Sequence, residues 1–110
     1  MNLLVQSAAD ENEVVLFVEG EVDAFTAPQL KEKLLELIQH STYPTVSLDV
    51  GNVTYMDSTG VGVLIGAMKS CKQSDRKLVI RNVPPRIERL FKITGLIELI
   101  SVEPLKGVSE

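Results

Sequence analysis

The chain contains the segment Thr45-Val46-Ser47-Leu48-Asp49-Val50, followed shortly by Tyr55-Met56-Asp57-Ser58-Thr59-Gly60-Val61-Gly62. The first segment is short, rich in β-branched residues and bounded by Pro44 and Gly51, a pattern that predicts a strand. After the second segment begins, apolar residues recur at helical spacing to about residue 74, which predicts a helix. A buried strand that is followed directly by a long helix favours an α/β fold.

The hydroxyl groups of Ser58 and Thr59 fall at the expected start of this helix. Unpaired N–H groups and the helix dipole favour negative charge at that position. Asp, Ser and Thr also cap helices, so a purely structural role is the alternative. Gly60 and Gly62 lie in the first turn, where a glycine costs up to about 1 kcal/mol relative to alanine. Such a cost is explained if another protein comes close to this backbone, so the pattern predicts a contact site.

The residues before these segments predict two strands and a helix. Residues 3–8 and 13–19 are mostly apolar, and the short polar link between them predicts an antiparallel hairpin. Thr26 is suited to cap a helix, and Pro28 falls near the first turn, where proline is tolerated. An apolar stripe at helical spacing then continues this helix to about residue 39.

The residues that follow the Ser58 helix predict a strand, a helix and a weaker final element. Residues 77–81 are typical of a fourth strand. A third helix follows the prolines at 84–85 and ends at Gly95. Residues 96–100 are interpreted as a short edge strand, and residues 104–110 as a frayed tail.

The order of these elements predicts one α/β domain over residues 1–110. We expect a mixed, mostly parallel sheet of four to five strands, with an N-terminal antiparallel hairpin and three or more packed helices. Sites in such sheets gather at the carboxyl ends of the parallel strands. Residues 20–25 should follow the second strand and residues 52–59 the third. The two segments should therefore lie at the same edge of the sheet.

Two motifs resemble those of a known protein family. Met56-Asp57-Ser58-Thr59-Gly60-Val61-Gly62-Val63 is similar to the phosphorylation-site signature of bacterial anti-sigma factor antagonists, which are single STAS domains. Gly20-Glu21-Val22-Asp23-Ala24-Phe25-Thr26-Ala27-Pro28 resembles the turn that ends the second strand of these antagonists and opens their first helix. The motifs have the order and separation of the family, and the pattern of elements matches from about residue 3 to residue 102.

The resemblance implies a protein-binding switch. Such a protein, when dephosphorylated, binds an anti-sigma factor that is also a serine kinase of the GHKL ATPase type, and thereby frees the sigma factor. Phosphorylation of the serine corresponding to Ser58 releases it, and a PP2C-type phosphatase resets it. Ser58 is the expected acceptor and Thr59 the alternative, while Asp23 is expected to position the partner or the serine. The expected partner-binding residues are Glu21, Asp23, Phe25, Thr26, Met56, Asp57, Ser58, Thr59, Gly60, Val61 and Gly62.

Charge is unevenly distributed along the chain. Residues 1–57 hold ten acidic and two basic residues, whereas residues 58–110 hold five acidic and nine basic ones. The acidic residues from position 10 to position 23 have no base among them, and part of this run could steer a basic partner surface. The net charge of −4 argues against nucleic acid as a partner. Basic residues at helical spacing between positions 86 and 92 do not change that interpretation.

The sequence offers little for catalysis. No histidine is suitably located to activate Ser58, and no cluster of His, Cys, Asp and Glu has metal-ligand spacing. We therefore expect neither an enzyme nor a bound metal or cofactor. Asp23 and Asp57 could form a carboxylate pair, although both are expected to be exposed and of ordinary acidity. Gly66 is expected to permit close helix packing, since its spacing from the other glycines does not fit a dinucleotide fingerprint.

Several features indicate the cytoplasm. No apolar run approaches the roughly 20 residues of a membrane span, and the first residues lack the pattern of a signal peptide. Cys71 is the only cysteine, so no internal disulfide can form, which agrees with a reducing compartment. We expect a monomer when the protein is free, with no membrane contact.

Two other functions remain open on sequence grounds. The chain could be a STAS interaction domain of another system, such as a lipid-transport subunit or a larger signalling complex. It could also be a small nucleotide-binding sensor that uses the helix N-terminus.

Overall fold

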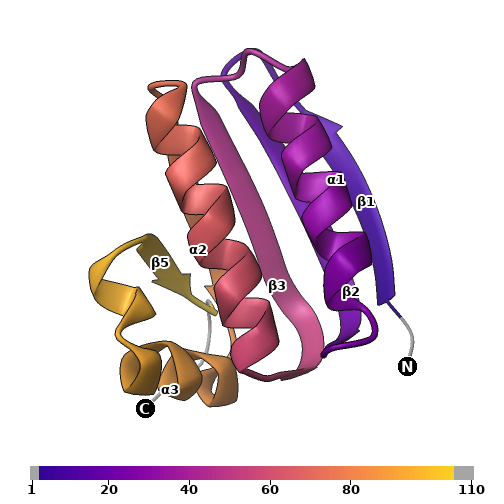
Figure 1. Ribbon diagram of the computed structural model, residues 1–110, viewed down its shortest axis with the longest axis vertical. Coiled ribbons are helices and arrows are strands. Elements are labelled where there is room, and N and C mark those ends of the chain that lie inside the picture. Colours follow the sequence, from indigo (N-terminus) through magenta and orange to yellow (C-terminus); the bar gives the residue numbers. More distant parts are fainter. Residues whose placement is uncertain (1–2, 106–110) are drawn as a thin grey trace.

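The structure is a computed structural model that describes residues 3–105, which form one sheet with helices packed against it (Figure 1). Helices α1 and α2 lie side by side across one face of the sheet, and α3 lies beside the N-terminal end of α2 (Figure 1). The strands are β1 (Leu3–Ala9), β2 (Glu13–Val22), β3 (Thr45–Met56), β4 (Lys77–Val83) and β5 (Ser101–Pro104). The helices are α1 (Ala27–His40), α2 (Ser58–Gln73), α3 (Pro85–Thr94) and the 3₁₀ turn η1 (Leu96–Glu98).

The strands follow one another across the sheet in chain order, β1-β2-β3-β4-β5. The pair β1 and β2 is antiparallel, and β2, β3 and β4 are parallel, both as predicted. Strand β5 lies parallel to β4 at the far edge. Asp10 closes the hairpin, because its side-chain oxygen accepts hydrogen bonds from the N–H groups of Asn12 and Glu13. The predicted fold class, a mixed and mostly parallel α/β sheet with an N-terminal hairpin, is therefore confirmed.

Strands β2, β3 and β4 continue beyond the ends that the sequence predicted. Residues 20–22 and 51–56, expected in loops, are strand residues, and Glu21 pairs with Tyr55. The glycines after the predicted ends of β2 and β3 explain the error in these two strands. Gly20 has a φ of 116° and adjoins a shift of register inside β2, so it marks an irregularity within the strand. The two segments expected to carry the site are thus held by the sheet itself.

The predicted edge strand over residues 96–100 is wrong. Gly95 ends α3 in the left-handed conformation, with a φ of 80°, and η1 follows it directly. Leu96 and Ile100 are both buried whereas Glu98 between them is exposed, which fits a helical turn, because in a strand all three side chains would share one face. The edge strand is instead β5, which begins after this turn.

The predicted frayed tail over residues 104–110 is wrong at its first residues. Pro104 belongs to β5, and the N–H of Leu105 donates to the carbonyl of Val83 at 3.0 Å. Residues 106–110 lie outside the described residues.

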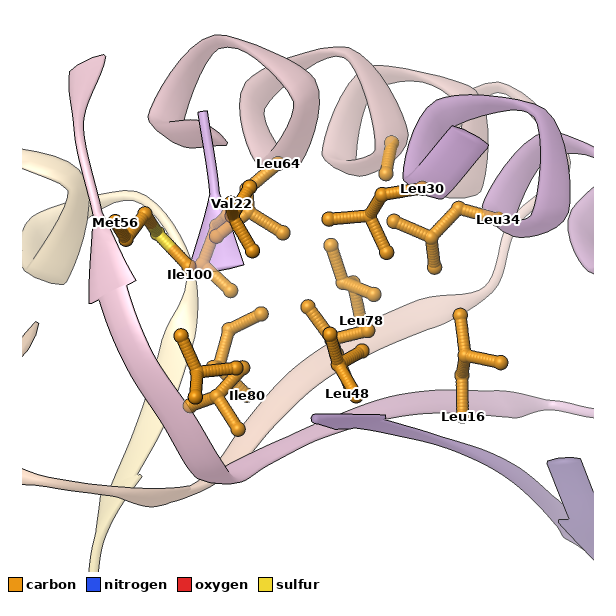
Figure 2. Close-up of a cluster of buried hydrophobic side chains, with 14 of the residues drawn as sticks. Leu16, Val22, Leu30, Leu34, Leu48, Met56, Leu64, Leu78, Ile80 and Ile100 are labelled. Atoms are coloured by element: carbon orange, nitrogen blue, oxygen red, sulfur yellow. The ribbon is translucent and has the colours of Figure 1, made fainter. Parts of the chain in front are cut away.

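Apolar side chains from the sheet and the helices meet in one core, part of which Figure 2 shows. Successive side chains of a strand point to opposite faces, so alternate residues of each central strand face α1 and α2. Burying one such side chain stabilises the fold by about 1.5–3 kcal/mol. The fully buried members include Leu16, Leu30, Leu34, Leu48, Leu64 and Ile80. This core fixes the ends of β2 and β3 against the start of α2.

A polar network ties the strands together on the other face of the sheet. Arg81 of β4 donates to the carboxylate of Glu13 at 2.7 Å and to that of Glu103 at 2.6 Å. The hydroxyl of the buried Ser47 also donates to Glu13. This hydrogen bond from Ser47, together with the bonds and charge of Arg81, lowers the pKa of Glu13 below its ordinary value. The network therefore joins β2, β3, β4 and β5 through one carboxylate and one guanidinium.

Candidate functional site

The N-terminus of α2 is capped by Asp57, which leaves Ser58 as the first helical residue. The Oδ1 atom of Asp57 accepts a hydrogen bond from the N–H of Thr59 at 3.0 Å. The carbonyl of Asp57 accepts from the N–H groups of Gly60 at 3.0 Å and Val61 at 3.4 Å. The side chain of Ser58 is exposed and makes no hydrogen bond within residues 3–105. Its hydroxyl is therefore not needed to hold the helix end.

This capping bears on what the helix N-terminus can bind. An anion at a helix start is held by unpaired N–H groups. Here the N–H groups of Thr59, Gly60 and Val61 already have acceptors, all on Asp57. The carboxylate of Asp57 also supplies the negative charge that the dipole favours. The helix start is thus already satisfied by the chain itself, which disfavours a nucleotide sensor built on it.

Gly60 is required by internal packing. A Cβ atom at this position would lie 2.7 Å from Cγ of Met56 and 2.8 Å from Cγ1 of Val22. Both distances are shorter than real Cβ contacts, and Val22 is fully buried. The cost of this glycine in a helix is therefore explained by the fold, without an external protein.

Gly62 and Gly66 have no such internal reason. A Cβ atom at either position would meet no atom within 4 Å. The expectation that Gly66 permits close helix packing is therefore wrong, since its missing side chain faces open space. Gly62 lies one turn from the start of α2, so its bare backbone is accessible beside the exposed hydroxyl of Ser58.

Asp23 organises the turn between β2 and α1. Its Oδ1 atom accepts hydrogen bonds from the N–H of Phe25 at 2.9 Å and from the N–H of Thr26 at 3.1 Å. The bond from the Thr26 N–H, followed by that from Phe25, lowers the pKa of Asp23 below its ordinary value. The expectation that Asp23 has ordinary acidity is therefore wrong. Its carboxylate is half-buried and fixed in one orientation.

Thr26 occupies the cap position of α1, but its hydroxyl does not bond to the helix. It donates to the carbonyl of Glu21 at 2.7 Å and accepts from the N–H of Asp23 at 3.0 Å. The first N–H groups of α1 are taken up by backbone carbonyls instead, such as that of Asp23 for Ala27. Thr26 is thus buried, and its hydroxyl stabilises the turn.

The two predicted motifs meet at the ends of β2 and β3. Val22 pairs with Met56, and the N–H of Asp57 donates to the carbonyl of Val22 at 3.3 Å. The turn that carries Asp23 and Phe25 therefore lies beside the start of α2. This is the edge of the sheet at which the topology predicted a site.

The predicted site residues divide into an accessible set and a supporting set. Phe25 belongs to the accessible set, with 81% of its surface exposed. Tyr55, which was not predicted as a site residue, is 48% exposed. It directly precedes Met56 of the site in the chain. An aromatic residue directly before the Asp57-Ser58 pair is the signal that could have identified it. Phe25, Ser58, Thr59 and Gly62 are exposed, Glu21, Asp23 and Asp57 are half-buried, and Thr26, Met56, Gly60 and Val61 are buried beneath them.

The arrangement exposes the hydroxyl of Ser58, and no histidine among residues 3–105 lies beside it. His40 lies at the opposite end of α1 from the Asp23 turn. Among residues 3–105, no group of three or more His, Cys, Asp and Glu side chains could hold a metal ion. None of the helices in this part of the chain is long and apolar enough to span a bilayer. Burial raises the pKa of the Cys71 thiol, which lies away from this surface in α2.

Comparison with known proteins identifies similar chains. The STAS domain family matches residues 5–107. An anti-sigma-B factor antagonist of Listeria monocytogenes is 41% identical over 108 residues, which cover 97% of this chain and 94% of that protein.

Solved structures with low sequence identity share the fold. An anti-sigma factor antagonist from Mycobacterium paratuberculosis superposes with a TM-score of 0.80 at 24% identity, covering 94% of this chain and 86% of that one. The Bacillus cell fate determinant SpoIIAA in its phosphorylated form gives a TM-score of 0.69 at 22% identity, covering 92% of this chain and 90% of that one.

Proposed function

The chain belongs to the STAS-domain family of anti-sigma factor antagonists, and from this we propose that it is a phosphorylation-controlled switch in the cytoplasm. In its unphosphorylated form, a monomer binds an anti-sigma factor that is also a serine kinase of the GHKL ATPase type, and thereby frees a sigma factor. The kinase then phosphorylates Ser58, which releases the antagonist, and a PP2C-type phosphatase resets it. The antagonist contributes no catalytic group to this cycle, because the kinase supplies ATP, magnesium and the general base.

The exposed hydroxyl of Ser58, relieved of any capping role by Asp57, is the observation that carries the proposal. A phosphorylated residue must enter the active site of another protein, so its hydroxyl must be accessible and its loss must not unfold the helix. Thr59 is also exposed, but it lines a groove between α1 and α2 together with Leu34 and Leu35 of α1. Ser58 is therefore the better acceptor.

The Asp23 turn supplies the second part of the proposed interface. Phe25 is an aromatic side chain that folding leaves almost wholly exposed, and exposed aromatic residues are typical anchors of protein interfaces. Asp23 holds this turn rigid and adds a negative charge to the turn, whose preceding residue Val22 bonds to Asp57 at the start of α2. A rigid, preorganised surface of this kind loses little conformational entropy on binding.

Release follows from local electrostatics in this proposal. A phosphate adds a charge of about −1.5 to −2 at pH 7. The nearest N–H groups of α2 are already bonded to Asp57, so the phosphate finds no unpaired donor there except the N–H of Ser58 itself. Docking would then bury an unpaired dianion next to a carboxylate, which costs several kcal/mol. About 2.8 kcal/mol already corresponds to a hundredfold loss of affinity.

The experiment is a phosphorylation assay with the GHKL-type kinase encoded in the same genome. Purified protein is incubated with this kinase and ATP, and intact mass and peptide mapping locate any phosphate. The wild type should gain one phosphate on Ser58, the Thr59→Ala variant should behave alike, and the Ser58→Ala variant should gain none. A phosphate on Thr59, or a Ser58→Ala variant that is still modified, would show that Ser58 is not the acceptor.

A protein that neither binds nor is modified by any such kinase would contradict the proposed switch as a whole. In that case the chain would act as an interaction domain of another system.

A further inference from the structure

A shallow hollow lies between the end of β3 and α3, next to the start of the Ser58 helix. Its volume is about 260 Å³, and Met56 forms part of its wall. Met56 is followed in the chain by Asp57 and Ser58, so the hollow is continuous with the proposed interface. We call this feature the α3 hollow; its other lining residues are Tyr55, Arg86, Ile87, Arg89, Leu90 and Ile93.

The α3 hollow has a buried apolar floor and exposed apolar edges. Ile87 is buried in the core and anchors α3 to the sheet. Ile93, two turns further along α3, is 77% exposed, and Tyr55 across the hollow is largely exposed as well. Single exposed apolar residues are common on any surface. Tyr55 and Ile93, however, border the same hollow beside a proposed interface. An apolar side chain of a partner could therefore bind between them.

Two basic residues border the same hollow. Arg86 and Arg89 are exposed, and neither forms an ion pair within residues 3–105. The situation of Arg81 is different, since two carboxylates of the chain neutralise it. Arg86 and Arg89 therefore present positive charge to an approaching molecule.

The surface around Ser58 consequently changes sign from one side to the other. Figure 1 shows the turn between β2 and α1 on one side of the start of α2, and α3 on the other side. The turn carries Asp23 with its lowered pKa, whereas α3 carries Arg86 and Arg89. Complementary charge steers association and fixes the orientation of docking. A partner that docks on Ser58 with basic groups facing the turn must therefore present acidic groups to α3.

We propose that the α3 hollow is a second contact for the anti-sigma factor, and that it takes an acidic segment with an apolar side chain. The apolar side chain enters between Tyr55 and Ile93, and neighbouring carboxylates pair with Arg86 and Arg89. The inference rests on the proposed function, because it names the chemistry of the partner segment at the same interface. Contacts at the α3 hollow and at Asp23, on opposite sides of Ser58, together fix the orientation of the bound partner.

The test compares binding kinetics of variants with the anti-sigma factor that wild-type protein binds, at low and at high ionic strength. The variant Arg86→Glu/Arg89→Glu should associate about tenfold more slowly at low salt, and high salt should reduce the difference, as expected for steering charges. The variant Ile93→Asp should dissociate at least about tenfold faster at both salt concentrations, as expected for an apolar anchor.

Matched controls come from the same part of the chain. Lys92 lies on α3 but does not line the hollow, so Lys92→Glu tests whether a charge reversal elsewhere on this helix has the same effect. Leu99 is an exposed apolar residue outside the hollow, so Leu99→Asp is the control for Ile93→Asp. Both controls should bind like the wild type. Circular dichroism should show all four variants folded, since the substituted side chains are exposed.

The outcomes separate this inference from the proposed function. If the wild type binds and the three substitutions in the hollow leave its rates unchanged, the α3 hollow is not part of the interface and the switch itself is unaffected. If the controls lose as much binding as the hollow variants, the effect comes from general charge or polarity and the inference is overturned. If the wild type binds no anti-sigma factor, the proposed function is wrong, and the inference that rests on it is wrong as well.

Discussion

Alanine at Gly60 and alanine at Gly62 should change stability in opposite directions, although the two glycines lie two residues apart in the same helical turn. At Gly60 the new methyl group would lie 2.7 Å from Cγ of Met56, 3.2 Å from its Sδ and 2.8 Å from Cγ1 of Val22. At Gly62 it would meet nothing within 4 Å. Conventional helix propensity would predict the same gain for both substitutions.

The magnitude follows from two opposing terms. Replacing glycine by alanine inside a helix gains up to about 1 kcal/mol. Overpacking a filled core costs about 1–3 kcal/mol, and Val22 is a stiff β-branched residue that cannot turn away easily. We therefore expect Gly60→Ala to lose about 1 kcal/mol net. Gly62→Ala should gain about 0.5–1 kcal/mol, because only the propensity term applies.

Urea denaturation measures the difference directly. With an m value of about 1–3 kcal/mol per molar for a small protein, the midpoints of the two variants should differ by about 0.5–2 M. Gly66→Ala is the matched control, since its position is also open, and it should be stabilised like Gly62→Ala. A Gly60→Ala protein as stable as the Gly62→Ala protein would refute the packing argument. Only Gly62→Ala should also weaken binding to the anti-sigma factor, because a methyl group would then separate the partner from the backbone beside Ser58.

Three further predictions address the site and the sheet. Ser58→Ala should keep the wild-type free energy of unfolding within about 0.5 kcal/mol and bind the kinase in the presence of ATP without being released, as a pull-down would detect. Asp23→Asn keeps the side-chain oxygen that holds the turn but removes the charge, so stopped-flow association should slow severalfold at low salt and recover at high salt. Glu13→Gln should lose about 1–2 kcal/mol of stability at neutral pH. The bonds from Ser47 and Arg81 lower the Glu13 pKa, so this difference should be complete above pH 4.5 and shrink in urea titrations as the pH falls below it.

Local patterns were sufficient to predict most of the architecture. The β-branched run before Gly51 and the helical spacing after Ser58 depend on neighbouring residues alone, so a strand followed by a helix was predictable. The continuation of β3 through residues 51–56 was not. It depends on pairing with the end of β2, and Gly51 looks like a break unless that pairing is known. The same limit applies to residues 96–100, whose apolar content suits a strand and a buried turn equally.

The chemistry of the site was predictable in kind but not in detail. Asp57 and Ser58 are both good caps, and the choice between them depends on where β3 ends. That point is set by the hydrogen bond from the N–H of Asp57 to the carbonyl of Val22, a contact between distant segments. Likewise, only the packed structure reveals that Gly60 serves the core while Gly66 faces open space.

The proposed switch requires that a phosphate on Ser58 abolishes binding to the anti-sigma factor. Isothermal titration calorimetry of that kinase against unphosphorylated and Ser58-phosphorylated protein, in the same buffer and without ATP, tests it most directly. We expect the phosphorylated form to bind at least about a hundredfold more weakly, which corresponds to about 2.8 kcal/mol. Equal affinity of the two forms would contradict it, because the unpaired dianion would then carry no cost at the interface.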